Sequence, residues 1–196
     1  MGGAVLTCGL LAGCAPQPAP TVIRTDPARL VLTLSELPYP GFQVAAATPD
    51  SGRRSNRAEA GGSPAVLHRL EQEGRTTGYS ATYTRAVQIA SAVGPVVIQS
   101  VATAYRTDGD ATAALGRDAA GLAGAGDTRL SAGRVGQAAV AFTSQRSAAQ
   151  VTYAQYVVEW RELNVVNAVV VEGNALTLDL GYALTLARLQ QRGEHP

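Results

Sequence analysis

Few residues in this chain have types and spacings that could carry out chemistry. His68 and Glu71 would lie one turn apart on a helix, a spacing that can bind a metal ion, but no third ligand is evident nearby, which favours a surface histidine. The chain contains no Gly-x-Ser-x-Gly or His-Glu-x-x-His motif. The acid pairs Asp108/Asp110 and Glu71/Glu73 fit turns, helix caps and solvated faces. We therefore predict no catalytic residue, no metal site and no cofactor.

The most specific motif is the Leu-Ala-Gly-Cys sequence that ends at Cys14 and resembles a bacterial lipobox. Residues 1–13 hold apolar residues followed by small ones, as in a signal peptide, although the first basic residue is Arg24. Cleavage would leave Cys14 at the start of the mature chain with lipid, including palmitate, on it. The alternative is a chance match in a segment rich in Ala, Gly and Leu. We expect a lipoprotein anchored to the cell membrane on its extracytoplasmic face.

The segment after this cysteine favours a spacer. Residues 14–28 include three prolines within five residues, which favours an extended, semi-rigid conformation. The remaining 29–193 is long enough for one domain with a sizeable core. Cys8 and Cys14 are the two cysteines of the chain, so this domain has neither a disulfide nor a cysteine-ligated metal.

Composition also limits the partners. The net charge is +1, which gives no long-range field and argues against nucleic acid as a partner. After Leu11, no apolar run approaches the roughly 20 residues that span a bilayer. The expected partners are the membrane, through lipid on Cys14, and an unknown small molecule, glycan or protein.

Alternating apolar and polar residues, broken by turn signals, predict an α+β domain. Links of hairpin length predict a mostly antiparallel sheet, and the recurring helices are expected to pack on one face, giving two layers. Residues 30–37 fit either a strand or a helical turn, and 49–62 fit a loop. Strands are predicted at 42–47, 78–87, 92–107, 135–145, 151–161 and 165–172, and helices at 63–74, 111–121 and 176–192.

The sheet face away from the helices is the candidate binding surface. If Tyr156, Val158 and Trp160 face the helices, the alternate residues of that strand line the other face, and residues of neighbouring strands join them. Aromatic rings with a few polar groups suit a small molecule or a glycan; an ordinary solvated face is the alternative. The candidate ligand-binding residues are Tyr83, Arg85, Gln99, Tyr105, Tyr153, Gln155, Glu159 and Arg161.

Several short motifs together resemble a known group of proteins. They are Leu37-Pro38 with Gly41-Phe42, then Tyr83-Thr84-Arg85, then Tyr105-Arg106-Thr107-Asp108 before an alanine-rich helix, then Val135 to Val140 and Trp160 to Val166. The pattern over 30–192 resembles secreted actinobacterial-type lipoproteins of unknown function, whose domain is similar to the extracellular sensor domain of PknH-type receptor kinases. The resemblance implies a sensor-like, ligand-binding domain with a cleft on the sheet. Those kinase domains carry disulfides, which this domain lacks, and no functional residue is carried over.

Three functions remain in competition, and each predicts a different structure. A non-enzymatic, anchored domain that binds a ligand or partner predicts a packed core and a shallow polar groove on the sheet. A carrier of lipid or another apolar molecule predicts a large apolar cavity between sheet and helices. A hydrolase predicts a deep pocket with His68 beside a nucleophile.

Overall fold

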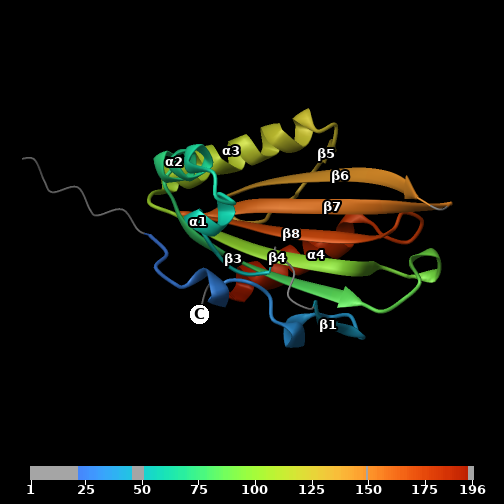
Figure 1. Ribbon diagram of the computed structural model, residues 1–196. Helices are drawn as coiled ribbons and strands as arrows, with labels where there is room; N and C mark the ends of the chain where they lie inside the picture. The colour runs from blue at the N-terminus through green and yellow to red at the C-terminus, as the bar shows by residue number, and fades with distance from the viewer. Residues whose placement is uncertain (1–21, 46–50, 149, 194–196) are drawn as a thin grey trace, which may run out of the picture.

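A single antiparallel sheet organises the part of the chain that the structure describes. The computed structural model describes residues 22–45, 51–148 and 150–193, so the predicted signal peptide, Cys14 and the three spacer prolines lie outside the described residues. Within these ranges the sheet has eight strands (Figure 1). They are β1 (Phe42–Val44), β2 (Gly52–Ser55), β3 (Arg75–Arg85), β4 (Pro95–Tyr105), β5 (Thr128–Leu130), β6 (Ala138–Ala148), β7 (Val151–Glu162) and β8 (Val165–Asn174).

The strands lie in the order β1-β3-β4-β8-β7-β6-β5, and β2 also pairs with β3. All of these pairings are antiparallel. β7 and β8 form the predicted hairpin, which turns at Leu163 with a φ of 49°. The Asn164 side chain ties this turn to the start of the domain, because its Oδ1 accepts from the Ile23 amide at 2.6 Å and its Nδ2 donates to the Tyr105 carbonyl at 2.9 Å.

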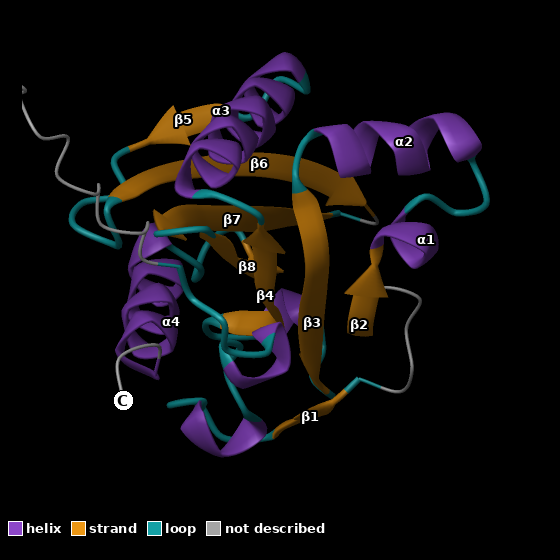
Figure 2. Ribbon diagram, turned by 90° about the vertical axis from the view of Figure 1, so that its left-hand side faces the viewer, coloured by secondary structure: helices purple, strands orange, loops and turns teal. Residues whose placement is uncertain are grey.

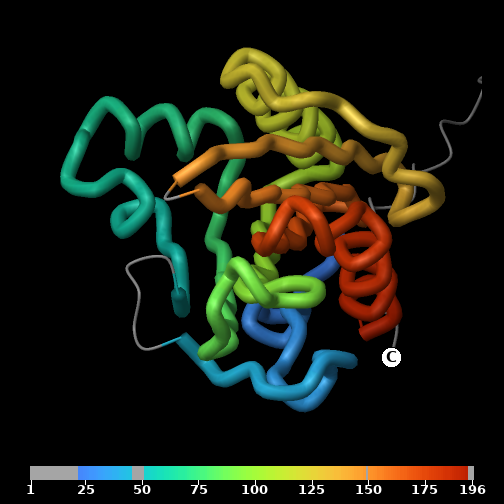
Figure 3. Tube along the Cα trace, turned by 90° about the vertical axis from the view of Figure 1, so that its right-hand side faces the viewer, coloured from blue at the N-terminus to red at the C-terminus, as the bar shows by residue number. Residues whose placement is uncertain are grey.

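Helices of the described chain pack on both faces of this sheet. Neighbouring residues on a strand point to opposite faces. Val140 on β6 packs in a cluster with α3, whereas the next residue, Ala141, packs in a cluster with α4. In Figure 3, α3 (yellow) and α4 (red) lie on either side of the orange strands. The helices are α1 (Asn56–Glu59), α2 (Pro64–Gln72), α3 (Asp108–Gly124) and α4 (Leu180–Gly193), with short 3-10 turns at Pro27–Arg29, Leu34–Glu36 and Ile89–Ser91.

The predicted α+β class with an antiparallel sheet is therefore confirmed, and one part of that prediction is corrected. The helices do not share one face, because the sheet presents apolar residues on both sides. On β7, Val158 and Trp160 point to the α4 face, and Val157 points to the α3 face; all three are buried. Two faces with buried apolar residues need two covering elements, so the domain has a helix layer on each side.

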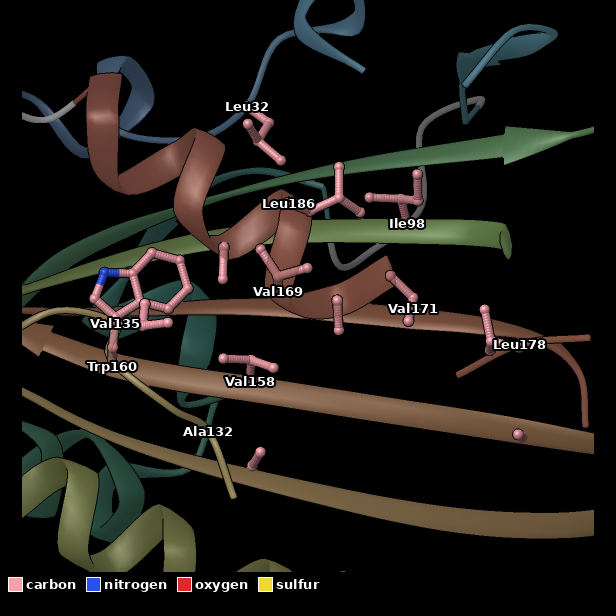
Figure 4. Packing of buried hydrophobic residues seen from close by; sticks show 14 of the residues in the cluster. Leu32, Ile98, Ala132, Val135, Val158, Trp160, Val169, Val171, Leu178 and Leu186 are labelled. Carbon is pink, nitrogen blue, oxygen red and sulfur yellow. The ribbon is translucent and has the colours of Figure 1, made fainter. Parts of the chain in front are cut away.

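The α4 face holds the main core (Figure 4). Leu186 of α4 lies over Val169, with Trp160 and Val158 beside them, and all four are fully buried. Close packing of this kind leaves no room for a ligand, and each buried side chain of this size stabilises the fold by about 1.5–3 kcal/mol. The α4 face is therefore a structural core.

Two segments that position the α3 face differ from their predictions. The expected loop at 49–62 contains β2 and α1, because Ser55 caps α1 by accepting from the Ala58 amide and β2 pairs with β3. Thr107, and not Asp110, caps α3, since the Thr107 hydroxyl accepts from the Asp110 amide at 3.0 Å. The 30–37 segment forms a 3-10 turn at Leu34–Glu36 and no strand. The start of α2 at Ser63 and Pro64 is as predicted.

Candidate functional site

A charged cleft of about 440 Å³ lies on the α3 face. Its walls come from α1, α2 and α3, and its floor comes from β2, β3 and β4. Figure 2 shows how α1, α2, α3, β2, β3 and β4 are arranged. Charged side chains supply seven of the eleven lining residues. The lining residues are Arg54, Glu59, Arg69, Leu70, Glu73, Arg75, Val101, Thr103, Tyr105, Arg117 and Asp118.

Arg75 fixes the wall formed by β2 and α1. Its guanidinium is buried and donates to the Arg54 carbonyl at 3.0 Å and to the Asn56 Oδ1 at 2.7 Å. Asn56 in turn donates a hydrogen bond from its Nδ2 to the Arg75 carbonyl at 2.7 Å. The guanidinium lies over Gly78, where a Cβ would come within 2.9 Å of Nη2, so a side chain at Gly78 would displace it. Glu59 lies 3.5 Å from Arg75 and 2.8 Å from Arg54, which balances charge on this wall.

The opposite wall joins α2 to α3. Arg117 of α3 lies 3.3 Å from Glu73 at the C-terminal cap of α2. The next residue, Asp118, follows Ala114 and Leu115 at helical spacing along α3 but is itself exposed and lines the cleft. Burial in the cleft raises the pKa of Asp118, and Arg117 opposes that rise. The residue as a whole nevertheless remains exposed to solvent.

Glu159 lies beneath α3 on β7, close enough to Asp118 to sense its charge. Burial, and secondarily the carboxylate of Asp118, raises the pKa of Glu159 to about 7. One of its carboxylate oxygens, Oε2, is buried and has no hydrogen-bond partner among the described residues. Burial and Asp118 also raise the pKa of Tyr105, which keeps this phenol neutral. The floor of the cleft thus adjoins an acidic, poorly solvated region.

The structure divides the eight predicted ligand-binding residues between the two faces. Tyr83 and Arg85 lie on the α4 face. Tyr83 is buried and donates its hydroxyl to the Leu32 carbonyl at 2.6 Å. Arg85 donates to the Val93 carbonyl at 2.8 Å, with its guanidinium 5.6 Å from the ring of Phe42. Both therefore lie away from the other six.

The other six share the α3 face but do not meet at one point. Of the eight, Tyr105 alone lines the cleft. Gln99 donates to the Ser80 hydroxyl at 3.0 Å, and Arg161 pairs with Asp108 and donates to Gln137 Oε1 at 2.8 Å. The predicted open face is interrupted because α3 packs against β4, β7 and β8 on this face.

Tyr153 and Gln155 line a separate pocket of about 170 Å³ near the first residues of β7. Arg146 lies 5.2 Å from the Tyr153 ring and pairs with Glu172 across this pocket. These charges are already paired, and the pocket is below the usual volume of about 300 Å³ or more for a small-molecule site. The cleft is therefore the stronger candidate.

Sequence reasoning missed most of the cleft. Arg54 and Glu59 fell in the segment expected to be a loop, and the charges of α2 looked like an ordinary solvated face. One sequence signal was available: Asp118 places a charge at the position where the apolar stripe of the alanine-rich helix would continue, and the structure leaves this residue exposed.

Two alternative functions lack their expected site among the described residues. His68 is exposed on α2, lies 2.9 Å from Gln72 and lines none of the described cavities, so the pocket that a hydrolase required is not found in the described ranges. The same ranges hold no group of three metal-ligating side chains. The apolar space beside α3 is an open groove of about 420 Å³ against β6, not an enclosed cavity between layers.

No helix of the described chain is long and apolar enough to cross a membrane.

The fold defines a class: a single α+β domain with one antiparallel sheet and helices on both faces. Among solved structures, the extracellular domain of PknH from Mycobacterium tuberculosis is similar, with a TM-score of 0.59 and 12% identity over 90% of this chain and 98% of that one. The predicted likeness to that domain is thereby confirmed at the level of the fold. No protein-family model and no curated protein matches the chain.

Proposed function

We propose that this protein is a non-enzymatic, membrane-anchored lipoprotein whose sensor-like domain binds a small polar ligand in the charged cleft. One observation carries the proposal: the cleft holds partly desolvated charges of both signs on walls that other contacts fix. Its volume of about 440 Å³ is within the usual range of small-ligand sites, about 300–1,000 Å³.

The fixed walls favour binding over a passive role. Ion pairs from Arg54 and Arg75 to Glu59, and from Arg117 to Glu73, hold the lining residues in place before a ligand arrives. A preorganised site loses less side-chain freedom when it binds. Arg75 is buried and Arg54, Glu59 and Glu73 are half-buried, and charges in such surroundings interact more strongly with a charged ligand than fully exposed ones do.

The lipid anchor rests on the sequence around Cys14 and on the proline-rich spacer. The fold likeness to an extracellular domain supports a position outside the cytoplasm. Labelling of cells with an alkyne analogue of palmitate tests the anchor. We expect label on the wild-type chain and on Cys8→Ala, and no label on Cys14→Ala. Label that persists in Cys14→Ala would contradict the anchor.

Native mass spectrometry tests ligand binding. The purified chain is incubated with the small molecules of the culture medium, below about 1,000 Da, and scanned for retained mass. Thr103→Trp places an indole in the cleft and should abolish the retained mass, whereas Thr185→Trp, exposed on α4, should keep it. Equal retention in both variants would exclude the cleft as the binding site.

A further inference from the structure

The charges of the cleft do not all pair with one another. Glu59 is shared by Arg54 and Arg75, and Glu73 pairs with Arg117. Two lining groups are left over. Among the described residues, the Arg69 guanidinium and the Asp118 carboxyl make no hydrogen bond or ion pair.

These two groups come from the two walls of the same cavity. Arg69 lies on α2 and Asp118 on α3, and the pair between Glu73 and Arg117 joins those helices. Arg69 is exposed, with its five guanidinium donors free to bind a carboxylate or phosphate in a bidentate manner. Asp118 is also exposed, and its ionised carboxylate offers two acceptor oxygens to an ammonium group.

Asp118 would gain most from a cation. Arg117 favours the charge of Asp118 and is the larger of the two charge effects on it, but the Glu73 carboxylate repels that charge. An ammonium group bound at Asp118 would relieve that repulsion, whereas an anion there would increase it.

A ligand that carries charge of a single sign would be repelled by the like charges that line the cleft. A simple anion would approach Glu59, Glu73 and Asp118, and a simple cation would approach four arginines. A molecule with both charges meets the free guanidinium with its anionic end and the free carboxyl with its cationic end.

We infer that the cleft binds a zwitterion with an ammonium and a carboxylate group, that is, a free amino acid or a short peptide with free ends. The carboxylate binds Arg69 and the ammonium binds Asp118. This inference rests on the proposed function and adds the chemical class of its ligand.

The test is a binding screen on the full chain. Thermal shift is measured with the twenty amino acids and with Ala-Ala and Ala-Ala-Ala, and each hit is repeated as its N-acetylated and its C-amidated form by calorimetry. We expect at least one free zwitterion to raise Tm, and each blocked form to bind at least about tenfold more weakly, since every 1.4 kcal/mol is tenfold in Kd.

Variants assign the two ends. Arg69→Gln should weaken binding of the free form at least about tenfold yet leave binding of the C-amide unchanged, because the amide has no carboxylate to lose. Asp118→Asn should weaken the free form and leave the N-acetyl form unchanged. Arg188→Gln, exposed on α4, and Asp127→Asn, outside the cleft, are the matched controls and should bind as the wild type does.

Three results would overturn the inference: no member of the panel binds, both blocked forms bind as tightly as the free form, or neither variant weakens binding. If the culture-medium experiment still yields a ligand that Thr103→Trp abolishes, the cleft function stands and only the zwitterion assignment fails. If that experiment also yields nothing, both fail.

Discussion

The same strands form a packed core on one face of the sheet and part of a charged cleft on the other. Along β7, Val158 and Trp160 are fully buried against α4, while Glu159 between them points to the acidic region beside the cleft. Because side chains alternate along a strand, one stretch of sequence supplies both a packed core and the surroundings of a charged site. A rigid core directly behind a site holds its charged groups in place.

The covering helices explain the difference. α4 presents Leu186 with Ala183 and Ala187 to the sheet and packs without gaps. α3 presents small residues, with Leu115 as its large buried residue, and its stripe ends in Asp118 toward α2. Because α3 presents small residues and a charge at this point, it does not fill the space beside α1 and α2. That space is the cleft.

The largest expected effect comes from opening the α4 face. Trp160→Ala removes a fully buried indole and should lower the free energy of unfolding by about 3–5 kcal/mol. Tyr153→Ala, on the half-buried edge of the other face, should cost less than half as much. Urea unfolding measures both. Equal losses would show that the α4 face is no more a core than the α3 face.

A second prediction concerns Glu159, whose substitution should raise the free energy of unfolding, whereas Trp160→Ala lowers it. Its pKa is about 7 in the folded chain against an ordinary value of 4.5, so the folded state binds the proton more tightly. Its burial therefore costs little below pH 4.5, and the cost grows as pH rises and is complete above pH 7, at about 3 kcal/mol for this shift. Glu159→Gln should stabilise the chain by about that amount at pH 8 and by under about 1 kcal/mol at pH 5.

Unfolding measured across this pH range checks the prediction. In Asp118→Asn the gain from Glu159→Gln should shrink slightly, since burial is the larger cause of the shift and Asp118 the smaller. A gain that is flat with pH would contradict the buried, titrating carboxyl.

Arg75→Gln tests the wall of the cleft. It removes buried hydrogen bonds to Arg54 and Asn56, which should cost about 1–3 kcal/mol. Hydrogen exchange should rise at residues 54–59, because β2 and α1 lose the Arg75 side-chain bonds that add to the backbone pairing of β2 with β3. Arg57→Gln, exposed on α1, is the control and should change neither quantity. Unchanged exchange in Arg75→Gln would show that β2 and α1 do not depend on this side chain.

The smallest stability effect is expected at Arg69. Arg69→Gln removes an exposed guanidinium and should change the free energy of unfolding by less than about 0.5 kcal/mol. Chemical unfolding of the ligand-free chain checks this value. A loss above about 1 kcal/mol would show that Arg69 supports the fold and is not free for a ligand.

The sequence predicts the long elements well and their faces poorly. β7 and β8 carry clear alternation around a short turn, and α2 begins with a strong cap, so both were predictable. The grouping of Tyr83 with Tyr105 was wrong because the face of β3 depends on its register with β4, and a shift by one residue turns every side chain over.

The cleft depends on contacts that are distant in sequence. The bond from Arg75 to Asn56 spans 19 residues, and the pair between Glu73 and Arg117 joins two helices that β3 and β4 separate in the chain. No local pattern reports such contacts. The charge of Asp118 at the end of the apolar stripe of α3 was the one local sign of a site, and by itself it did not identify a partner.

An NMR titration tests the central claim that the ligand binds on the α3 face. The labelled chain is titrated with the molecule retained in the mass-spectrometry experiment, and backbone amide shifts are followed. We predict changes at residues 69–75, 101–105 and 117–118, and none at 183–187 on α4. Changes centred on α4, or on the small pocket of Tyr153 and Gln155, would contradict the account.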